Sequence, residues 1–130
     1  MSIRILVSTD GSDLSGKAID AAVELASKFG AELVGVTCVP NVLTADDVDQ
    51  TVLDRLYVVE RKAEEKKVAC KAVVKHSETV WQGILDCAEE FDASYIVMSS
   101  RGLGSIGSLL LGSETQKVLH QATRPVLIVR

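Results

Sequence analysis

The sequence predicts a single α/β domain built on a doubly wound, five-stranded parallel sheet with four helices. Short runs that are apolar throughout alternate along the chain with longer segments whose apolar residues repeat at helical spacing. Fully apolar strands that alternate with helices are typical of a parallel sheet covered on both faces. A length of 130 residues fits one such domain, placed at residues 1–130, and leaves no room for a second.

The first part of the chain marks the boundaries of two strands and the helix between them. Ile3–Val7 is an apolar run interrupted only by Arg4, and a polar turn follows it. Ser12 suits the capping position of the next helix, because its hydroxyl can accept a hydrogen bond from a backbone N–H of the first turn. Gly30 suits the end of that helix. The second strand is expected over Leu33–Val39.

The rest of the chain continues the alternation of helix and strand. A helix follows the second strand, because Val52, Leu56, Val59 and Ala63 fall on one helical face. The remaining expected elements are a strand over Ala69–Val74, a helix over Val80–Phe91, a strand over Tyr95–Met98, a helix over Thr115–Ala122 and a strand over Val126–Val129.

Composition and charge argue against several classes of function. The net charge is −4 and 4% of residues are aromatic, which offers neither a basic track nor a stacking platform for nucleic acid. No apolar run approaches the ~20 residues that span a bilayer, and the amino terminus shows no signal-peptide cleavage site. We therefore expect a cytoplasmic protein without a nucleic-acid or membrane partner. The three cysteines have no CxxC spacing, which predicts reduced, buried thiols.

Loops that follow the strands are the places to look for a binding site, because ligands of doubly wound sheets bind outside the carboxyl ends of the strands. Ser8–Ser12 follows the first strand, and the glycine- and serine-rich stretch Ser99–Gly107 follows the fourth. Glycines allow backbone N–H groups to approach a phosphate, and hydroxyls add donors. Ser113–Gln116 has the pattern of a capping box at the start of the last helix, whose dipole favours an anion. These residues predict either a phosphate-binding loop or a flexible surface loop with an ordinary cap.

The loop after the fourth strand also resembles a known family. Ser99-Ser100-Arg101-Gly102, nine residues and then Gly112-Ser113 match the frame Gly-x-x-Gly, nine residues, Gly-Ser/Thr of ATP-binding universal stress proteins, with Ser99 in place of the first glycine. The opening Ile5–Ser12 and the closing Arg124–Val129 are also similar to this family, and the resemblance covers the whole chain. It implies a fold of the flavodoxin-like or adenine-nucleotide alpha-hydrolase-like kind.

Carried over position by position, the resemblance implies an ATP site at the carboxyl ends of the strands. Asp10, at the position of the family's usual aspartate, is also the candidate to place Mg²⁺. The implied site residues are Ser8, Thr9, Asp10 and the backbone of Cys38 on the nucleoside side, Met98 and Ser99 beside the ribose and phosphates, and Gly102, Gly112, Ser113 and Thr115 as phosphate-facing donors.

Ser99 leaves two functions open. If its backbone needs a positive φ, the side chain is strained and crowds the phosphates, which favours a member of the family that binds no nucleotide and acts as an interaction dimer. If its backbone is extended, the hydroxyl can donate a hydrogen bond, which favours an ATP-binding sensor or regulatory module of the stress response. Asp10 is the one candidate general base, so we expect binding, with slow ATP hydrolysis at most.

The last expected strand, Val126–Val129, predicts how copies of the chain associate. It is apolar, carries no charge of its own and would lie at an edge of the sheet, where unpaired backbone groups invite another strand. The family resemblance implies a homodimer in which this strand pairs with its copy about a two-fold axis.

Overall fold

The protein was analysed as a computed structural model, which describes residues 2–41, 48–102 and 111–130. These described residues form five strands and four helices, and none of the helices is long and apolar enough to cross a membrane. The elements in chain order are β1 (Arg4–Ser8), α1 (Asp13–Phe29), β2 (Glu32–Val39), α2 (Gln50–Glu65), β3 (Cys70–His76), α3 (Val80–Glu90), β4 (Tyr95–Ser99), α4 (Ser113–Gln121) and β5 (Val126–Val129).

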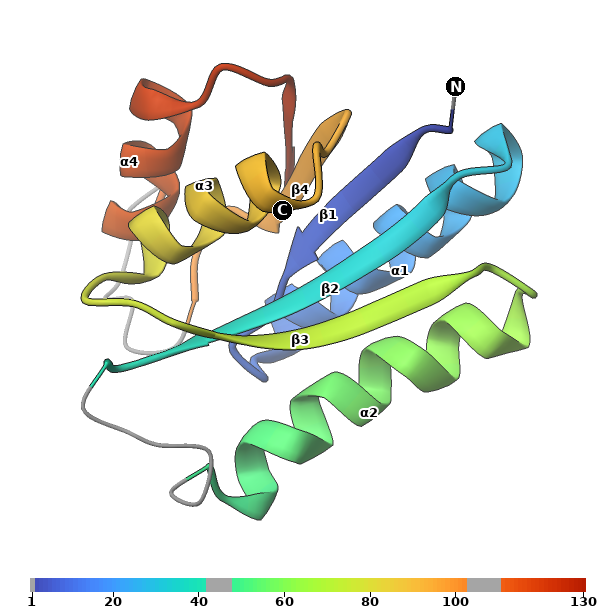
Figure 1. Ribbon diagram of the computed structural model, residues 1–130, viewed down its shortest axis with the longest axis horizontal. Helices are drawn as coiled ribbons and strands as arrows, with labels where there is room; N and C mark the ends of the chain where they lie inside the picture. The colour runs from blue at the N-terminus through green and yellow to red at the C-terminus, as the bar shows by residue number, and fades with distance from the viewer. Residues whose placement is uncertain (1, 42–47, 103–110) are drawn as a thin grey trace.

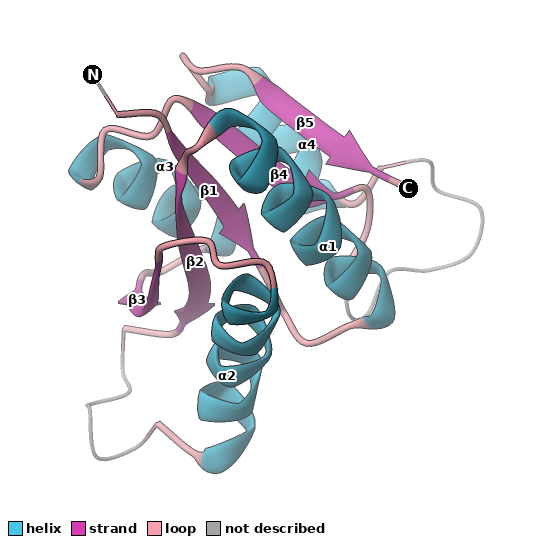
Figure 2. Ribbon diagram, turned by 90° about the vertical axis from the view of Figure 1, so that its right-hand side faces the viewer, coloured by secondary structure: helices cyan, strands magenta, loops and turns pink. Residues whose placement is uncertain are grey.

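The five strands form one sheet in the order β3-β2-β1-β4-β5, and all the pairings are parallel. The chain moves outward from β1 to β3, then returns through α3 to place β4 on the other side of β1. Helices α1 and α2 cover one face of the sheet, and α3 and α4 cover the other (Figures 1 and 2). The predicted fold class is therefore confirmed. The order differs from the 2-1-3-4-5 of flavodoxin, and its winding reverses between β1 and β4.

Each face of the sheet carries its own apolar core. In β1, Ile5 and Val7 pack under α1 and α2, whereas Leu6 packs under α3. All three side chains are fully buried. Successive side chains of a strand point to opposite faces, so a strand covered on both sides must be apolar at every position. This requirement explains why the central strands are mostly apolar in the sequence, whereas the edge strand β3 also carries Lys71 and Lys75.

Helix α1 has the ends that the sequence predicts. The Ser12 hydroxyl accepts a hydrogen bond from the Ser15 N–H at 3.1 Å, which satisfies one of the unpaired donors of the first turn. Gly30 ends the helix with φ of 63°, a left-handed conformation that glycine adopts without steric cost.

The capping box expected over Ser113–Gln116 is wrong. Helix α4 already includes Ser113, its capping residue is Gly112, and no side chain caps it. The carboxylate of Glu114 instead accepts a hydrogen bond from the backbone N–H of Trp81, 2.8 Å away in the first turn of α3. A carboxylate is favourable at the positive end of a helix, and here the helix that it stabilises is the neighbouring one. The bond ties α4 to α3.

Gly35 sets how closely α2 lies against the sheet, and its replacement tests that packing. A Cβ added at Gly35 would lie 2.7 Å from Cγ1 of Val59, in the buried layer between β2 and α2. We therefore expect Gly35→Ala to lower the free energy of unfolding by about 1–3 kcal/mol, measured by denaturant titration. Gly16→Ala is the control, because its nearest neighbour would be the Lys62 Nζ at 4.0 Å. Equal unfolding midpoints for Gly35→Ala and the native chain would contradict this packing.

Candidate functional site

The loops after β1 and β4 meet where the winding of the sheet reverses. A Cβ added at Gly102, in the loop after β4, would collide with the carboxylate of Asp10, in the loop after β1. The two residues are 92 positions apart in the chain (102 minus 10), and the sheet brings them into contact. Glycine is needed at position 102 because the Asp10 carboxylate occupies the space that a side chain would take. The sequence-predicted site therefore has its two halves side by side.

Hydrogen bonds within the loop after β1 hold Asp10 in place. The Thr9 hydroxyl, which is buried, shares a hydrogen bond of 3.1 Å with the Ser15 hydroxyl and accepts another from the Gly11 N–H at 3.2 Å. One oxygen of the Asp10 carboxylate, Oδ1, accepts from the Ser12 N–H at 2.9 Å. Gly11 has a φ of 85°, which allows the sharp turn into α1. Thr9 thus shapes the loop, and Asp10 is the acidic group that the loop positions.

The end of β4 is tied to the start of α4. The Gly112 N–H donates to the Ser100 carbonyl at 2.7 Å, and the buried Thr115 hydroxyl donates to the Ser99 carbonyl at 3.0 Å. Two of the expected phosphate-facing donors therefore make hydrogen bonds within the protein, where they fix the amino terminus of α4. Ser113 is exposed at that terminus. The spacer positions 103–110 lie outside the described residues.

Ser99 has a backbone that does not require glycine. Among the described non-glycine residues, only Lys67 and Asp92 have positive φ values, so Ser99 lies outside the strained left-handed region. Its hydroxyl donates to the Arg101 carbonyl at 2.7 Å. The Ser99 backbone is therefore not strained in a way that would disfavour nucleotide binding. Its hydroxyl stabilises the loop that leads to Gly102.

The remaining expected residues, Ser8, Cys38 and Met98, lie at or near the carboxyl ends of their strands. Cys38 is near the end of β2, and its thiol contacts the Val80 carbonyl of α3 at 3.6 Å. Burial raises the pKa of the Cys38 thiol to about 12, so it stays protonated at neutral pH and is no nucleophile. Met98 is buried in the core under α3 and α4, and Ser8 is half-buried at the end of β1. The Cys38 thiol is therefore engaged with α3, and Met98 belongs to the core beneath the sheet end rather than to the pocket lining.

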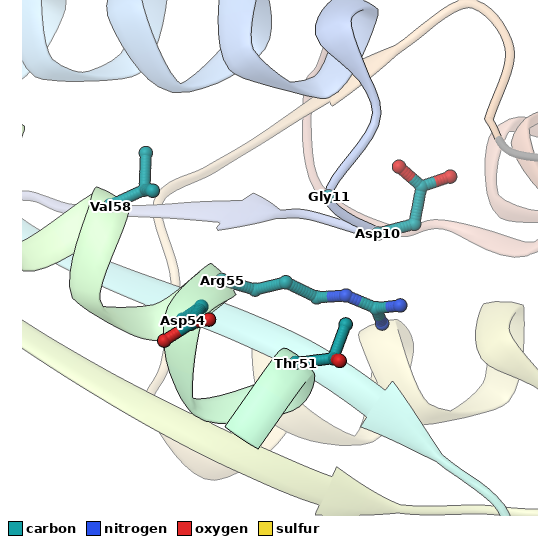
Figure 3. Close-up of a pocket in the computed structure, with 6 residues that line it drawn as sticks. All are labelled: Asp10, Gly11, Thr51, Asp54, Arg55 and Val58. Carbon is teal, nitrogen blue, oxygen red and sulfur yellow. The ribbon is translucent and has the colours of Figure 1, made fainter. Parts of the chain in front are cut away.

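A pocket of about 270 Å³ adjoins this site, between the loop after β1 and helix α2 (Figure 3). The guanidinium of Arg55 extends from α2 toward Asp10. Sequence reasoning missed Arg55, although one signal was present. Arg55 is three residues after the buried Val52 and four before the buried Val59, which places it at the border of the buried helical face. The lining residues are Asp10, Gly11, Thr51, Asp54, Arg55 and Val58.

Comparisons with known proteins agree on one family. The family model described as "Universal stress protein family" matches residues 1–130. The universal stress protein YxiE of Bacillus subtilis is 35% identical to this chain over 146 aligned residues, which cover 98% of each protein.

Solved structures of the same family superpose on the fold. A universal stress protein from Archaeoglobus fulgidus has a TM-score of 0.83 at 22% identity and covers 100% of both chains. A universal stress protein in complex with cAMP has a TM-score of 0.79 at 25% identity, covering 98% of this chain and 97% of the other.

Proposed function

Because this chain belongs to the universal stress protein family, we propose that it is a stress-response sensor or regulatory module that binds ATP between the loops after β1 and β4. The contact between Asp10 and Gly102 at the reversal of the sheet carries this proposal, since nucleotides bind at such points in doubly wound folds. The related protein in complex with cAMP supports an adenine nucleotide as the ligand. We keep the cytoplasmic location expected from composition, without nucleic-acid or membrane partners.

In this proposal the phosphates lie over Gly102 and the amino terminus of α4. Gly102 lets the backbone approach closely, and the exposed Ser113 with the helix dipole favours an anion. Asp10 contacts the ribose or holds Mg²⁺. Among the described residues no three His, Cys, Asp or Glu side chains are grouped to hold a metal. The proposed Mg²⁺ therefore depends on Asp10 together with the phosphate oxygens of ATP and water, a ligand set that is common for this ion.

We propose binding itself as the activity, with slow hydrolysis at most. The Asp10 carboxylate already accepts the Ser12 N–H through Oδ1, so this oxygen holds the turn into α1 rather than a substrate proton. A regulatory module needs no fast ATP turnover, because its output depends on whether ATP is bound or not.

Calorimetry on nucleotide-stripped protein tests the proposal. We expect MgATP to bind with a Kd in the micromolar range or weaker, which corresponds to about 8 kcal/mol or less. The absence of both a heat of binding and a thermal shift at millimolar ATP would contradict the proposal. That result would favour the second candidate, a family member without nucleotide that acts as an interaction dimer.

We also propose that the protein forms a homodimer through β5. This strand is at the edge of the described sheet, with β4 as its neighbour, and Leu127 is 44% exposed. Pairing of β5 with its copy would satisfy the edge and cover the same surface on both subunits. The dimer is compatible with either candidate function, and the open edge is the observation that supports it.

Ser99→Gly tests how the serine in place of the family's glycine affects binding. The Ser99 hydroxyl braces the Arg101 carbonyl, and its loss leaves the loop before Gly102 less ordered. We expect calorimetry to show ATP binding weakened by about 1 kcal/mol, roughly fivefold in Kd. Ser99→Ala, which keeps the Cβ, should weaken binding equally. If Ser99→Gly bound ATP more tightly while Ser99→Ala kept the native affinity, the result would show instead that the Cβ crowds the phosphates.

A further inference from the structure

We propose that Arg55, a residue of α2, contacts the base of the bound nucleotide in the pocket beside Asp10, on the side that the family resemblance already assigns to the nucleoside. This inference rests on the proposed nucleotide function and adds to it a residue from α2. It follows from the position of the guanidinium, from the charges around the pocket and from the size of the pocket.

The Arg55 side chain is positioned between the end of β2 and the loop after β1. Its Nη1 donates to the Thr37 hydroxyl at 3.4 Å, and Thr37 is buried in β2 immediately before Cys38. A Cβ added at Gly11 would lie 3.0 Å from the Arg55 Nε and 3.3 Å from its Cγ. The side chain therefore runs close along the Gly11 backbone. Gly11 adjoins Asp10 and Thr37 adjoins Cys38, two residues that the family resemblance assigns to the nucleoside side, whereas the proposed function places the phosphates over Gly102 and α4.

The guanidinium retains donors for a ligand. In the part of the chain that the structure describes, its hydrogen bond is the long one to Thr37, which uses one of five N–H groups. A guanidinium is planar and permanently charged, so it can stack on an aromatic ring or donate to ring nitrogens. Adenine offers both a flat face and acceptor nitrogens. The chemistry of Arg55 therefore fits a base.

The charges around the pocket favour a neutral base over a phosphate. Asp10 and Asp54 line the pocket together with Arg55, so two carboxylates accompany one cation. The Asp54 carboxylate, which lies away from Gly102 on α2, would repel a triphosphate placed in this pocket, whereas adenine is uncharged at neutral pH. The volume of about 270 Å³ is just below the ~300 Å³ at which pockets for whole small molecules begin, which suits one part of a nucleotide.

The test compares three probes on the native chain and on Arg55 variants. ATP and inorganic tripolyphosphate are titrated by calorimetry, and adenosine is measured by its displacement of ATP. We expect Arg55→Gln to lower the affinities for ATP and adenosine by the same factor, about tenfold, and to leave the affinity for tripolyphosphate unchanged. Arg55→Lys should not restore binding, because a lysine keeps the charge without the planar group.

Arg61→Gln is the matched control, because Arg61 lies on the same helix but pairs with Glu65 at the exposed surface, 3.0 Å away. It should bind all three probes as the native chain does. If Arg55→Gln lowered the affinities for ATP and tripolyphosphate but not the affinity for adenosine, the base contact would be overturned and Arg55 would be assigned to the phosphates. Native-like binding of all probes by Arg55→Gln would overturn this inference alone, whereas a native chain that binds no nucleotide would overturn it together with the proposed function.

Discussion

Gly102→Ala is expected to lower the affinity for ATP more than tenfold while the protein remains folded. The added Cβ would collide with the Asp10 carboxylate, which can move aside because it is the end of a side chain. Its displacement removes a charged contact to ribose or Mg²⁺, and hydrogen bonds to charged groups contribute about 1.5–3 kcal/mol. Calorimetry measures the affinity, and thermal unfolding without ligand shows that the fold is retained.

A double-mutant cycle separates this mechanism from a general disturbance of the loop. Asp10→Ala should itself weaken ATP binding, and Gly102→Ala added to that variant should cost little more, because the displaced carboxylate is already gone. Gly16→Ala, which adds a Cβ in open surroundings, should bind ATP as the native chain does. Additive losses in the cycle would show that Gly102 acts through something other than Asp10.

Ile128→Pro is expected to convert the proposed dimer into monomers, as measured by sedimentation. The carbonyls of Pro125 and Val129 accept hydrogen bonds from the N–H groups of Ile96 and Ser100, at 2.9 and 2.8 Å, so these positions of the last strand face β4. Backbone groups of successive residues in a strand point to opposite sides, which directs the Ile128 N–H to the open edge. Proline removes that donor and blocks a partner strand without breaking the ladder to β4.

Ile128→Ala is the matched control for this variant. Ile128 packs against the core under α3 and α4, so both substitutions lose that side chain, but alanine keeps the N–H. We expect Ile128→Ala to remain a dimer with lower stability. A native chain that sediments as a monomer at roughly tens of micromolar would contradict the pairing, and so would a dimeric Ile128→Pro.

The order of the strands and helices could be predicted because its signals are local. The central strands β1, β2 and β4 are covered on both faces and are therefore mostly apolar, and each helix shows its buried face within a few turns. The ends of α1 were visible for the same reason, since Ser12 caps a donor three residues away. The two loops of the candidate site were predicted from spacing and resemblance, and the folded sheet brings Gly102 of one loop to Asp10 of the other.

Glu114 shows where local reasoning fails. Its spacing from neighbours suggested a role within its own helix, but its carboxylate bonds to Trp81, 33 positions away. A carboxylate accepts from whichever suitable donor lies nearest, and only the packing of α4 beside α3 decides which donor that is. Ser99 is a similar case, because the backbone angle that removes the strain argument depends on the strand to which it belongs.

By itself, the sequence determined the fold class, the order of its elements, the edge position of the last strand and the two loops of the candidate site. Only the tertiary structure decided that Arg55 lies beside the loop after β1 and that Ile128 faces the α3 and α4 core while Leu127 is exposed. The reason is physical. Backbone preferences and amphipathic patterns act over neighbouring residues, whereas Arg55 reaches Gly11 because Val59 of α2 packs closely against Gly35 of β2 in the folded protein.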